Sequence, residues 1–365
     1  MKIEIKQSTC IKYLELVGKI ATKHVTLPVL QCVLITVEEQ KMTLRTTNLE
    51  IATEVEVETV SIESGGKIAV PAVTLLQTIQ QIHAEKIVLE SNEDGVLHVK
   101  TPKTTIAIKS IPAEEFPMIP KIEGEEIIVN RNQFSLGVKT VATAASQSSI
   151  KPELGSVYVY QKREHSLTFV ATDSFRLMEK TVSQKDVIMN TSILIPFKNA
   201  LELARFCDLL DTDPVLIVND NQCSLSFKEV YITSRLVSGT FPDYNSIIPK
   251  EFTTKGVLLK HDIVTALKKT NIFLNKFRQV KMCVSENMIK VSSQNNDVGT
   301  ISDEIPFQFE GDELELSFNQ QYLSDGIPHV TDDSVVFAFA GIGRPLVISG
   351  ISDKTMRYLV MPMNK

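Results

Sequence analysis

The sequence of 365 residues contains an internal repeat of about 125 residues. Three markers of different chemistry recur at the same offset of 125 positions. They are Thr47-Asn48 and Thr172-Asp173, Pro71 and Pro196, and Phe116-Pro117 and Phe241-Pro242. A fainter third copy follows, with Ser292–Asn295 in place of the polar turn and Phe318-Asn319 near the position of the proline. Three copies account for the whole chain and leave no room for a separate catalytic domain.

Each copy predicts the same order of elements. A helix with apolar residues three and four positions apart comes first, at residues 11–21, 134–145 and 263–274. A second helix is predicted at residues 71–82, 196–210 and 319–330, beginning at the proline in the first two copies. Alternating apolar and polar residues predict strands, for example at 42–44, 55–57, 87–89, 96–99, 105–108 and 167–169. The predicted fold class is α+β, with three tandem similar domains that each pack two helices on antiparallel sheets. Polar linkers at 121–125 and 250–255 give predicted domains at 1–124, 125–250 and 251–365.

The composition describes a folded chain and limits its partners. Hydrophobic residues make up 43% and charged residues 22%. The start of the chain lacks the apolar core of a signal peptide, and no apolar run reaches the roughly 20 residues of a membrane span, so we expect a cytoplasmic protein. The net charge of −6 argues against a protein that coats nucleic acid with its whole surface, although it allows lysines to gather on one face.

Motifs for catalysis and metal binding are missing from the sequence. The five cysteines are dispersed without a CxxC pair, so we interpret them as buried thiols and expect no metal site. Gly341–Leu346 resembles a dinucleotide loop, but Leu346 replaces the third glycine and Pro345 stands where a helix would begin. An enzyme is the competing class, yet no residue suggests a mechanism, and no cofactor is expected.

Five short motifs, in this order, resemble the bacterial sliding clamp family, the beta subunit of DNA polymerase III. They are Thr26–Leu30, Thr47–Ile51, Ala171–Leu177, Gly239–Tyr244 and Tyr358–Met363. The resemblance implies a non-enzymatic processivity factor in which two chains join head to tail into a six-domain ring around double-stranded DNA. It also implies that the ring tethers the polymerase alpha subunit, the clamp loader and repair proteins. A clamp paralogue that acts as a regulator or decoy of replication proteins is the alternative.

The resemblance places helices around the central hole, where contacts with DNA are electrostatic and independent of sequence. On the first helix, Lys12, Lys19 and Lys23 fall within about 40° of one another at 100° per residue. The complete set of expected DNA-facing residues is Lys12, Lys19, Lys23, His24, Lys139, Lys151, Lys198, Arg205, Lys268 and Lys269. The alternative for each lysine is a solvated polar helix face.

The family captures short partner peptides in an apolar cleft between its second and third domains. The matching residues are Leu154, Thr172, Ser174, Phe175, Arg176, Leu177, Pro242, Ile247, Asn319, Tyr322, Leu359, Val360, Met361, Pro362 and Met363. The family usually has Gly-His where this chain has Ser174-Phe175, which puts a bulkier apolar ring at the rim. The alternative is that the terminal Leu359–Met363 finishes a strand and packs inward.

Ring closure requires the first domain of one chain to pair with the third domain of the other. Residues 105–108 alternate like an edge strand that could continue a neighbour's sheet. The expected interface residues are Lys100, Lys103, Ile106 and Ile108 on one side, and Ile272, Phe273, Asp303 and Glu304 on the other. Lysines would face acids across it, and the apolar residues would decide its stability. The alternative is that Ile272 and Phe273 are ordinary helix-core residues.

Overall fold

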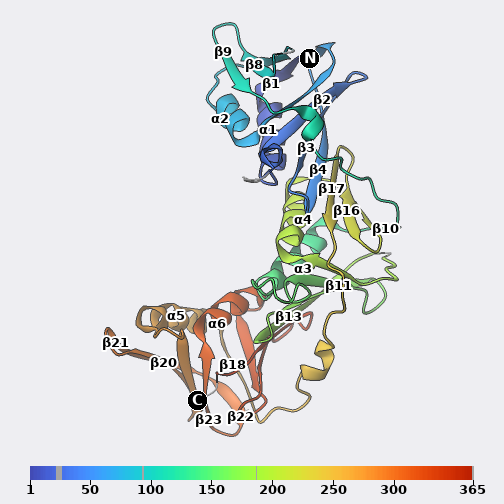
Figure 1. Cartoon of the computed structure of the whole chain (residues 1–365). Helices are drawn as coiled ribbons and strands as arrows, with labels where there is room; N and C mark the ends of the chain where they lie inside the picture. Colours follow the sequence, from blue (N-terminus) through green and yellow to red (C-terminus); the bar gives the residue numbers. More distant parts are fainter. Residues whose placement is uncertain (22–26, 93, 186, 364–365) are drawn as a thin grey trace. The chain divides into compact units, whose positions relative to one another are not determined.

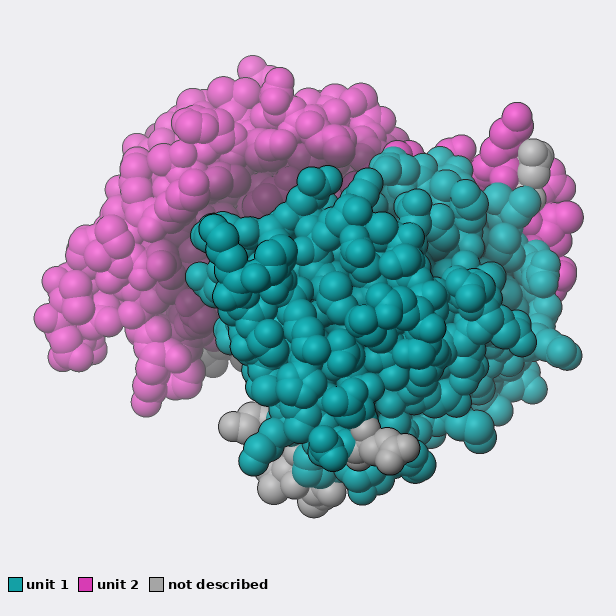
Figure 2. Space-filling model, turned by 90° about the horizontal axis from the view of Figure 1, so that it is seen from above, with its two compact units in different colours: residues 1–131, 205–236 teal, residues 132–204, 237–365 magenta. Residues whose placement is uncertain are grey.

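A computed structural model describes the chain except for residues 22–26, 93, 186 and 364–365 (Figure 1). The chain divides into two compact units, coloured separately in Figure 2. Unit 1 comprises Met1–Arg131 and Arg205–Leu236, and unit 2 comprises Asn132–Ala204 and Val237–Lys365.

Among its described residues, unit 1 contains two antiparallel sheets. The five-stranded sheet has the order β5 (Ser61–Ser64), β1 (Lys2–Lys6), β7 (Lys86–Ser91), β8 (Val96–Lys100), β9 (Thr105–Lys109). The eight-stranded sheet has the order β10 (Glu125–Ile128), β15 (Val215–Val218), β16 (Gln222–Ser226), β17 (Val230–Arg235), β4 (Ile51–Val57), β3 (Lys41–Thr47), β2 (Cys32–Glu38), β6 (Gly66–Pro71). Helices α1 (Gln7–Gly18) and α2 (Ala72–Gln80) pack against each other beside these strands (Figure 1).

Unit 2 also contains two antiparallel sheets within its described part. The nine-stranded sheet has the order β14 (Ile193–Pro196), β11 (Ser156–Tyr160), β12 (Ser166–Thr172), β13 (Arg176–Ser183), β26 (Met356–Val360), β25 (Leu346–Gly350), β24 (Ser334–Phe339), β18 (Thr254–Leu259), β22 (Gln308–Gly311). The four-stranded sheet has the order β21 (Gly299–Pro306), β20 (Met288–Asn295), β19 (Gln279–Ser285), β23 (Leu314–Asn319). The helices of the second and third copies are α3 (Arg131–Ala142), α4 (Phe197–Leu209), α5 (Lys260–Thr270) and α6 (Gln320–Gly326).

Successive copies of the repeat share a sheet. Strand β4 of the first copy pairs with β17 of the second, with Val55 opposite Val230 and Ile51 opposite Ser234. Strand β13 of the second copy pairs in the same way with β26 of the third. Each junction is therefore a continuous ladder of backbone hydrogen bonds, which explains why the compact units do not follow the repeat.

The six predicted helices are confirmed as elements, with ends shifted by a few residues. In the third copy the predicted helix at 319–330 divides into α6 and a 3-10 turn, Ile327–His329. Pro328 lies in that turn, and its missing N–H cannot continue the α-helical hydrogen bonds. On α1 the buried face comprises Cys10, Tyr13, Leu14, Leu16 and Val17. Ile11, which the periodicity placed on that face, is half-exposed, so this assignment was wrong.

Four of the five cysteines are buried as predicted, and Cys283 is half-buried. Over the described ranges, no helix is long and apolar enough to cross a membrane. Within the same residues, no group of three or more histidine, cysteine, aspartate or glutamate side chains is arranged to hold a metal ion.

Candidate functional site

The predicted peptide cleft is organised by the pairing of β13 with β26 in unit 2. Arg176 lies opposite Val360, and Leu177 lies opposite Leu359. Beyond the strand, the backbone N–H of Met361 donates to the carbonyl of Phe175 at 2.8 Å. The tail then runs to the third copy, where the N–H of Met363 donates to the Ser317 carbonyl at 2.7 Å. This ladder brings the Thr172–Leu177 motif and the terminal motif side by side, although they are about 180 positions apart.

The turn before β13 projects Phe175 into solvent. The Thr172 hydroxyl donates to the Arg176 carbonyl and accepts from the Ser174 N–H. The Asp173 carboxylate accepts from the N–H groups of Phe175 and Arg176, at 2.9 and 3.0 Å. Ser174 has φ +78°, a conformation that costs a residue with a side chain about 1–3 kcal/mol. The closed turn leaves the Phe175 side chain 60% exposed.

Arg176 joins the second copy to the third. Its guanidinium donates to Asp173 at 2.9 Å and to Asp325 at 2.6 Å, and it lies 4.4 Å from the ring centroid of Tyr322. The Arg176 side chain is only 10% exposed. Asn319 caps α6 by accepting from the Gln321 N–H, and this fixes the helix that carries two of these partners. The charge of Arg176 is thus already neutralised by two carboxylates.

The apolar residues expected in the cleft divide into an accessible rim and a closed floor. Phe175, Ile247 and Met361 are 60, 55 and 37% exposed, and Pro242 is also exposed. Leu177, Leu359 and Val360 are 1, 3 and 0% exposed. The alternative that the terminal strand packs inward is therefore correct for Leu359 and Val360. Pro362 and Met363 are half-buried, and Leu154 is buried in its own turn, where its carbonyl accepts from the Ser146 N–H.

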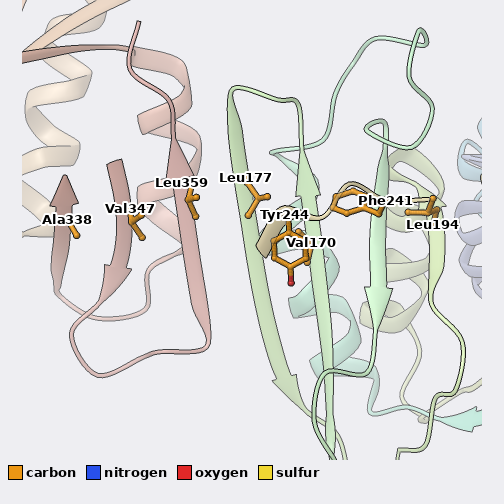
Figure 3. Packing of buried hydrophobic residues seen from close by; sticks show 8 residues of the cluster. All are labelled: Val170, Leu177, Leu194, Phe241, Tyr244, Ala338, Val347 and Leu359. Atoms are coloured by element: carbon orange, nitrogen blue, oxygen red, sulfur yellow. The ribbon is translucent and has the colours of Figure 1, made fainter. Parts of the chain in front are cut away.

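Beneath the rim lies a cluster that the sequence did not predict. Figure 3 shows its eight buried side chains, which follow neighbouring strands from β24 to β14 and include Phe241 and Tyr244 of the linker between copies. The members are Val170, Leu177, Leu194, Phe241, Tyr244, Ala338, Val347 and Leu359. Tyr158 stacks on Phe241 with 4.8 Å between ring centroids. The linker is thereby held against the face of the nine-stranded sheet that carries these side chains.

A buried carboxylate holds the same linker. Glu179 is 4% exposed and accepts hydrogen bonds from the Tyr244 hydroxyl, from Arg357 at 2.6 Å and from Lys162 at 3.2 Å. Burial alone would raise the pKa of Glu179, but these hydrogen bonds and the two positive charges outweigh it and lower the pKa below its usual value. Glu179 was not identified as a site residue from the sequence. The repeat could have pointed to it, because Glu54 stands 125 positions before Glu179, at the equivalent place in the first copy.

The predicted DNA-facing residues are mostly solvent-exposed within their own units. Lys12 and Lys19 are exposed in unit 1, where Arg205 is half-buried and donates to the Leu16 carbonyl at 2.8 Å. In unit 2 the exposed members are Lys139, Lys151, Lys198, Lys268 and Lys269. Lys23 and His24 lie outside the described residues.

Lys269, a predicted DNA-facing residue, pairs with an acid that was predicted at the ring interface. The Lys269 ammonium lies 2.8 Å from the Asp303 carboxylate, so a predicted DNA-facing residue neutralises a predicted interface residue. Because such a surface pair contributes about 0–1 kcal/mol, the two side chains can separate at little cost.

Some of the predicted interface residues lie on strands at sheet edges within the described residues: Ile106 and Ile108 on β9, and Asp303 and Glu304 on β21. Lys100 lies on β8, and Ile272 and Phe273 lie in the 3-10 turn Asn271–Phe273 that follows α5. Within the described residues β9 pairs only with β8, so it is an edge strand as predicted; Ile106 is half-exposed and Ile108 is 6% exposed. In unit 2, Ile272 is 67% exposed and Phe273 is half-exposed, so the alternative of ordinary helix-core residues is wrong for Ile272.

The interface charges have partners inside the chain. Lys100 lies 2.9 Å from Glu90, and Glu304 lies 3.7 Å from Lys290, while Lys103 is exposed. These existing ion pairs reduce the free energy that a new ion pair across an interface can contribute, because exchanging one partner for another gains little.

Comparison with known families accounts for the repeat. The N-terminal domain of the DNA polymerase III beta subunit matches residues 1–120, the central domain matches 128–243, and the C-terminal domain matches 245–364. The chain belongs to the DNA polymerase III beta subunit family. Members of this family are sliding clamps, processivity subunits without a catalytic site, and this agrees with the prediction that the chain is not an enzyme.

Individual relatives cover the chain from end to end. It is 27% identical to the beta sliding clamp of Pseudomonas putida over 374 aligned positions, with complete coverage of both proteins. The crystal structure of the DNA polymerase III subunit beta from Pseudomonas aeruginosa has a TM-score of 0.94 and 25% identity, again over the whole of both chains. The beta subunit from Thermotoga maritima, at 25% identity, has a TM-score of 0.93 and covers 100% of this chain and 99% of that one.

Proposed function

We propose that two copies of this beta subunit close head to tail into a six-domain ring that encircles double-stranded DNA and tethers replication proteins to it. The observation that carries the proposal is the tandem match of all three beta subunit domains along the full chain. We retain 1–124, 125–250 and 251–365 as the domain boundaries. The site of action is the cytoplasm, where the polymerase meets DNA.

Retention on DNA in this proposal is topological. A ring that slides needs contacts that are weak and independent of sequence, and lysines on helix surfaces supply them to phosphates. The exposed Lys12, Lys19, Lys139, Lys198 and Lys268 support this role, because each lies on a helix or directly after one.

The test compares nicked circular DNA with the same DNA cut once, after loading by a clamp loader. We expect the protein to stay on the circle through a high-salt wash and to leave the cut DNA. Equal retention on both would contradict a topological link. Primer extension by the cognate polymerase then separates a processivity factor from a decoy paralogue, which would inhibit synthesis.

We further propose that partner peptides bind at the rim formed by Phe175, Pro242, Ile247 and Met361. Leu177 and Leu359 are buried, and Phe175 and Met361 lie two residues away from them along the chain. We propose that Phe175 or Met361 moves aside when an apolar peptide side chain enters. Such a rearrangement lowers the apparent affinity by the fraction of molecules that are open. Methionine is suited to this movement, since it is unbranched and adapts its shape.

Phe175→Ala tests the rim, and Phe277→Ala is its matched control because both phenylalanines are 60% exposed in unit 2. Isothermal titration with a clamp-binding peptide of the polymerase alpha subunit is the measurement. We expect Phe175→Ala to change the affinity by about fivefold or more and Phe277→Ala to leave it within about twofold. An equal effect of the two variants would contradict a binding site at this rim.

A further inference from the structure

A second recess lies in unit 2, away from the Phe175 rim. It has a volume of about 560 Å³ and is bordered by strands β13, β18, β24, β25 and β26 and by residues 248–252 of the linker. Strand register places its side chains on one face of the sheet, because Glu179 lies opposite Arg357, Val336 opposite Ser349, and Lys255 opposite Ala338. This is the face that carries the cluster of Figure 3.

The recess is strongly cationic although the chain is acidic. Five cationic side chains and one carboxylate, Glu179, line it. The cations are Lys162, Arg163, Lys255, Lys354 and Arg357. Glu179 already accepts hydrogen bonds from Lys162, Arg357 and Tyr244, so it can neutralise no further charge.

Three of the cations, Arg163, Lys255 and Lys354, have no acidic partner among the described residues, and Lys354 donates to the Gly350 carbonyl. Arg163 and Lys255 are exposed. Glu310 lies opposite Lys255 in the β18–β22 register but is not paired with it. The remaining positive potential attracts anionic groups, and the partly enclosed walls concentrate it.

The recess beside the equivalent carboxylate in unit 1 shows that this charge is not a general consequence of the repeat. Its three cations are all paired: Arg45 and Lys121 with Glu54, and Lys67 with Glu38. The recess of unit 1 therefore has similar basic residues whose charges are neutralised, unlike those of the recess in unit 2.

The recess also offers apolar surface. Phe252 is 38% exposed at its edge, and Ile248 and Pro249 are half-buried beside it. Val336 and Val347 are 8 and 7% exposed and line its base. A phosphate backbone has no apolar side chain to place against these residues, whereas an acidic peptide with interspersed leucine or phenylalanine satisfies both the charge and the apolar surface.

We propose that this recess binds an acidic, apolar-containing segment of a partner protein. Ile247 of the Phe175 rim and Ile248 of the recess are consecutive residues, so one partner could engage both. Two linked contacts of moderate strength raise the overall affinity without further contacts, because the second becomes intramolecular.

The test measures fluorescence anisotropy of a labelled peptide of alternating glutamate and leucine, titrated with the full-length protein. Arg163→Glu with Lys255→Glu is expected to weaken binding about tenfold, because two attractions become repulsions. The control, Lys41→Glu with Lys67→Glu, makes the same change in net charge on exposed lysines of unit 1 and is expected to stay within about twofold.

Two further variants test the chemistry of the recess itself. Glu179→Gln releases Lys162 and Arg357 and should strengthen binding, a gain that misfolding cannot produce. Phe252→Ser should weaken binding of the glutamate–leucine peptide and leave a glutamate–glycine peptide unaffected.

If the control double variant, Lys41→Glu with Lys67→Glu, loses as much peptide affinity as Arg163→Glu with Lys255→Glu, the recess is not the binding site. Displacement of the peptide by short duplex DNA would show that the surface binds nucleic acid. Failure of the peptide to bind would also overturn the proposal. These measurements use the free protein, so they are independent of ring closure on DNA.

Discussion

Truncation of Glu179 to alanine should loosen the linker that packs, through Phe241 and Tyr244, on one face of the nine-stranded sheet. The Tyr244 hydroxyl would lose its bond to a charged acceptor, worth about 1.5–3 kcal/mol, and keep Tyr160 as its partner at 2.6 Å. Lys162 and Arg357 are 30 and 36% exposed and can turn to water, so each adds only about 0.5 kcal/mol. The expected destabilisation of the closed linker is about 3 kcal/mol.

Glu54→Ala makes the same truncation in the first copy. Its donors, Arg45 and Lys121, are 33 and 70% exposed, and the linker there is held separately by Tyr231, whose hydroxyl bonds to Ile122 and Pro120. Two solvent-accessible pairs contribute about 1 kcal/mol together. The matched truncations should therefore differ by about 2 kcal/mol in local stability.

Native-state hydrogen exchange measures the two linkers separately. The Val237 N–H is protected by the Leu194 carbonyl, and the Ile122 N–H by the Tyr231 hydroxyl. Glu179→Ala should speed exchange at Val237 about a hundredfold, since 1.4 kcal/mol is about a factor of ten. Glu54→Ala should speed exchange at Ile122 about fivefold. Equal acceleration at the two sites, or none at Val237, would refute the argument that burial makes Glu179 the stronger anchor.

Three further predictions concern the interface, a helix and acid stability. Ile272→Ala with Phe273→Ala should yield monomers by sedimentation, and an unchanged dimer mass would count against this interface. Gly137→Ala should destabilise the protein by about 1–3 kcal/mol in urea, since its new β-carbon overlaps the Phe169 ring; stabilisation, usual for this exchange in helices, would contradict that packing. Burial alone would raise the pKa of Asp353, but hydrogen bonds lower it to about 2 from 3.8. Its stabilisation is thus present above pH 3.8 and lost as pH falls through 2, a decline that Asp353→Asn should lack in acid denaturation.

The repeated order of elements could be predicted from the sequence, since hydrophobic periodicity and proline positions act through neighbouring residues. The offset that joins Thr47 to Thr172 predicted three similar α+β domains, and alternation at 105–108 predicted the edge strand β9. The family's motifs are short and contiguous, so they could also be recognised from the sequence alone.

Which surfaces of these elements remain accessible depends on contacts between residues that are far apart in the chain. Arg176 reaches Asp325 across 149 positions and Glu179 reaches Arg357 across 178, pairings that no local pattern encodes. The pairing of β26 with β13 and β25 places Leu359 and Val360 in the interior of the sheet, where both are buried, while Phe175 stays exposed. Strand periodicity specifies the two faces of a strand, whereas the neighbouring strands and the crossing linker determine which face is covered.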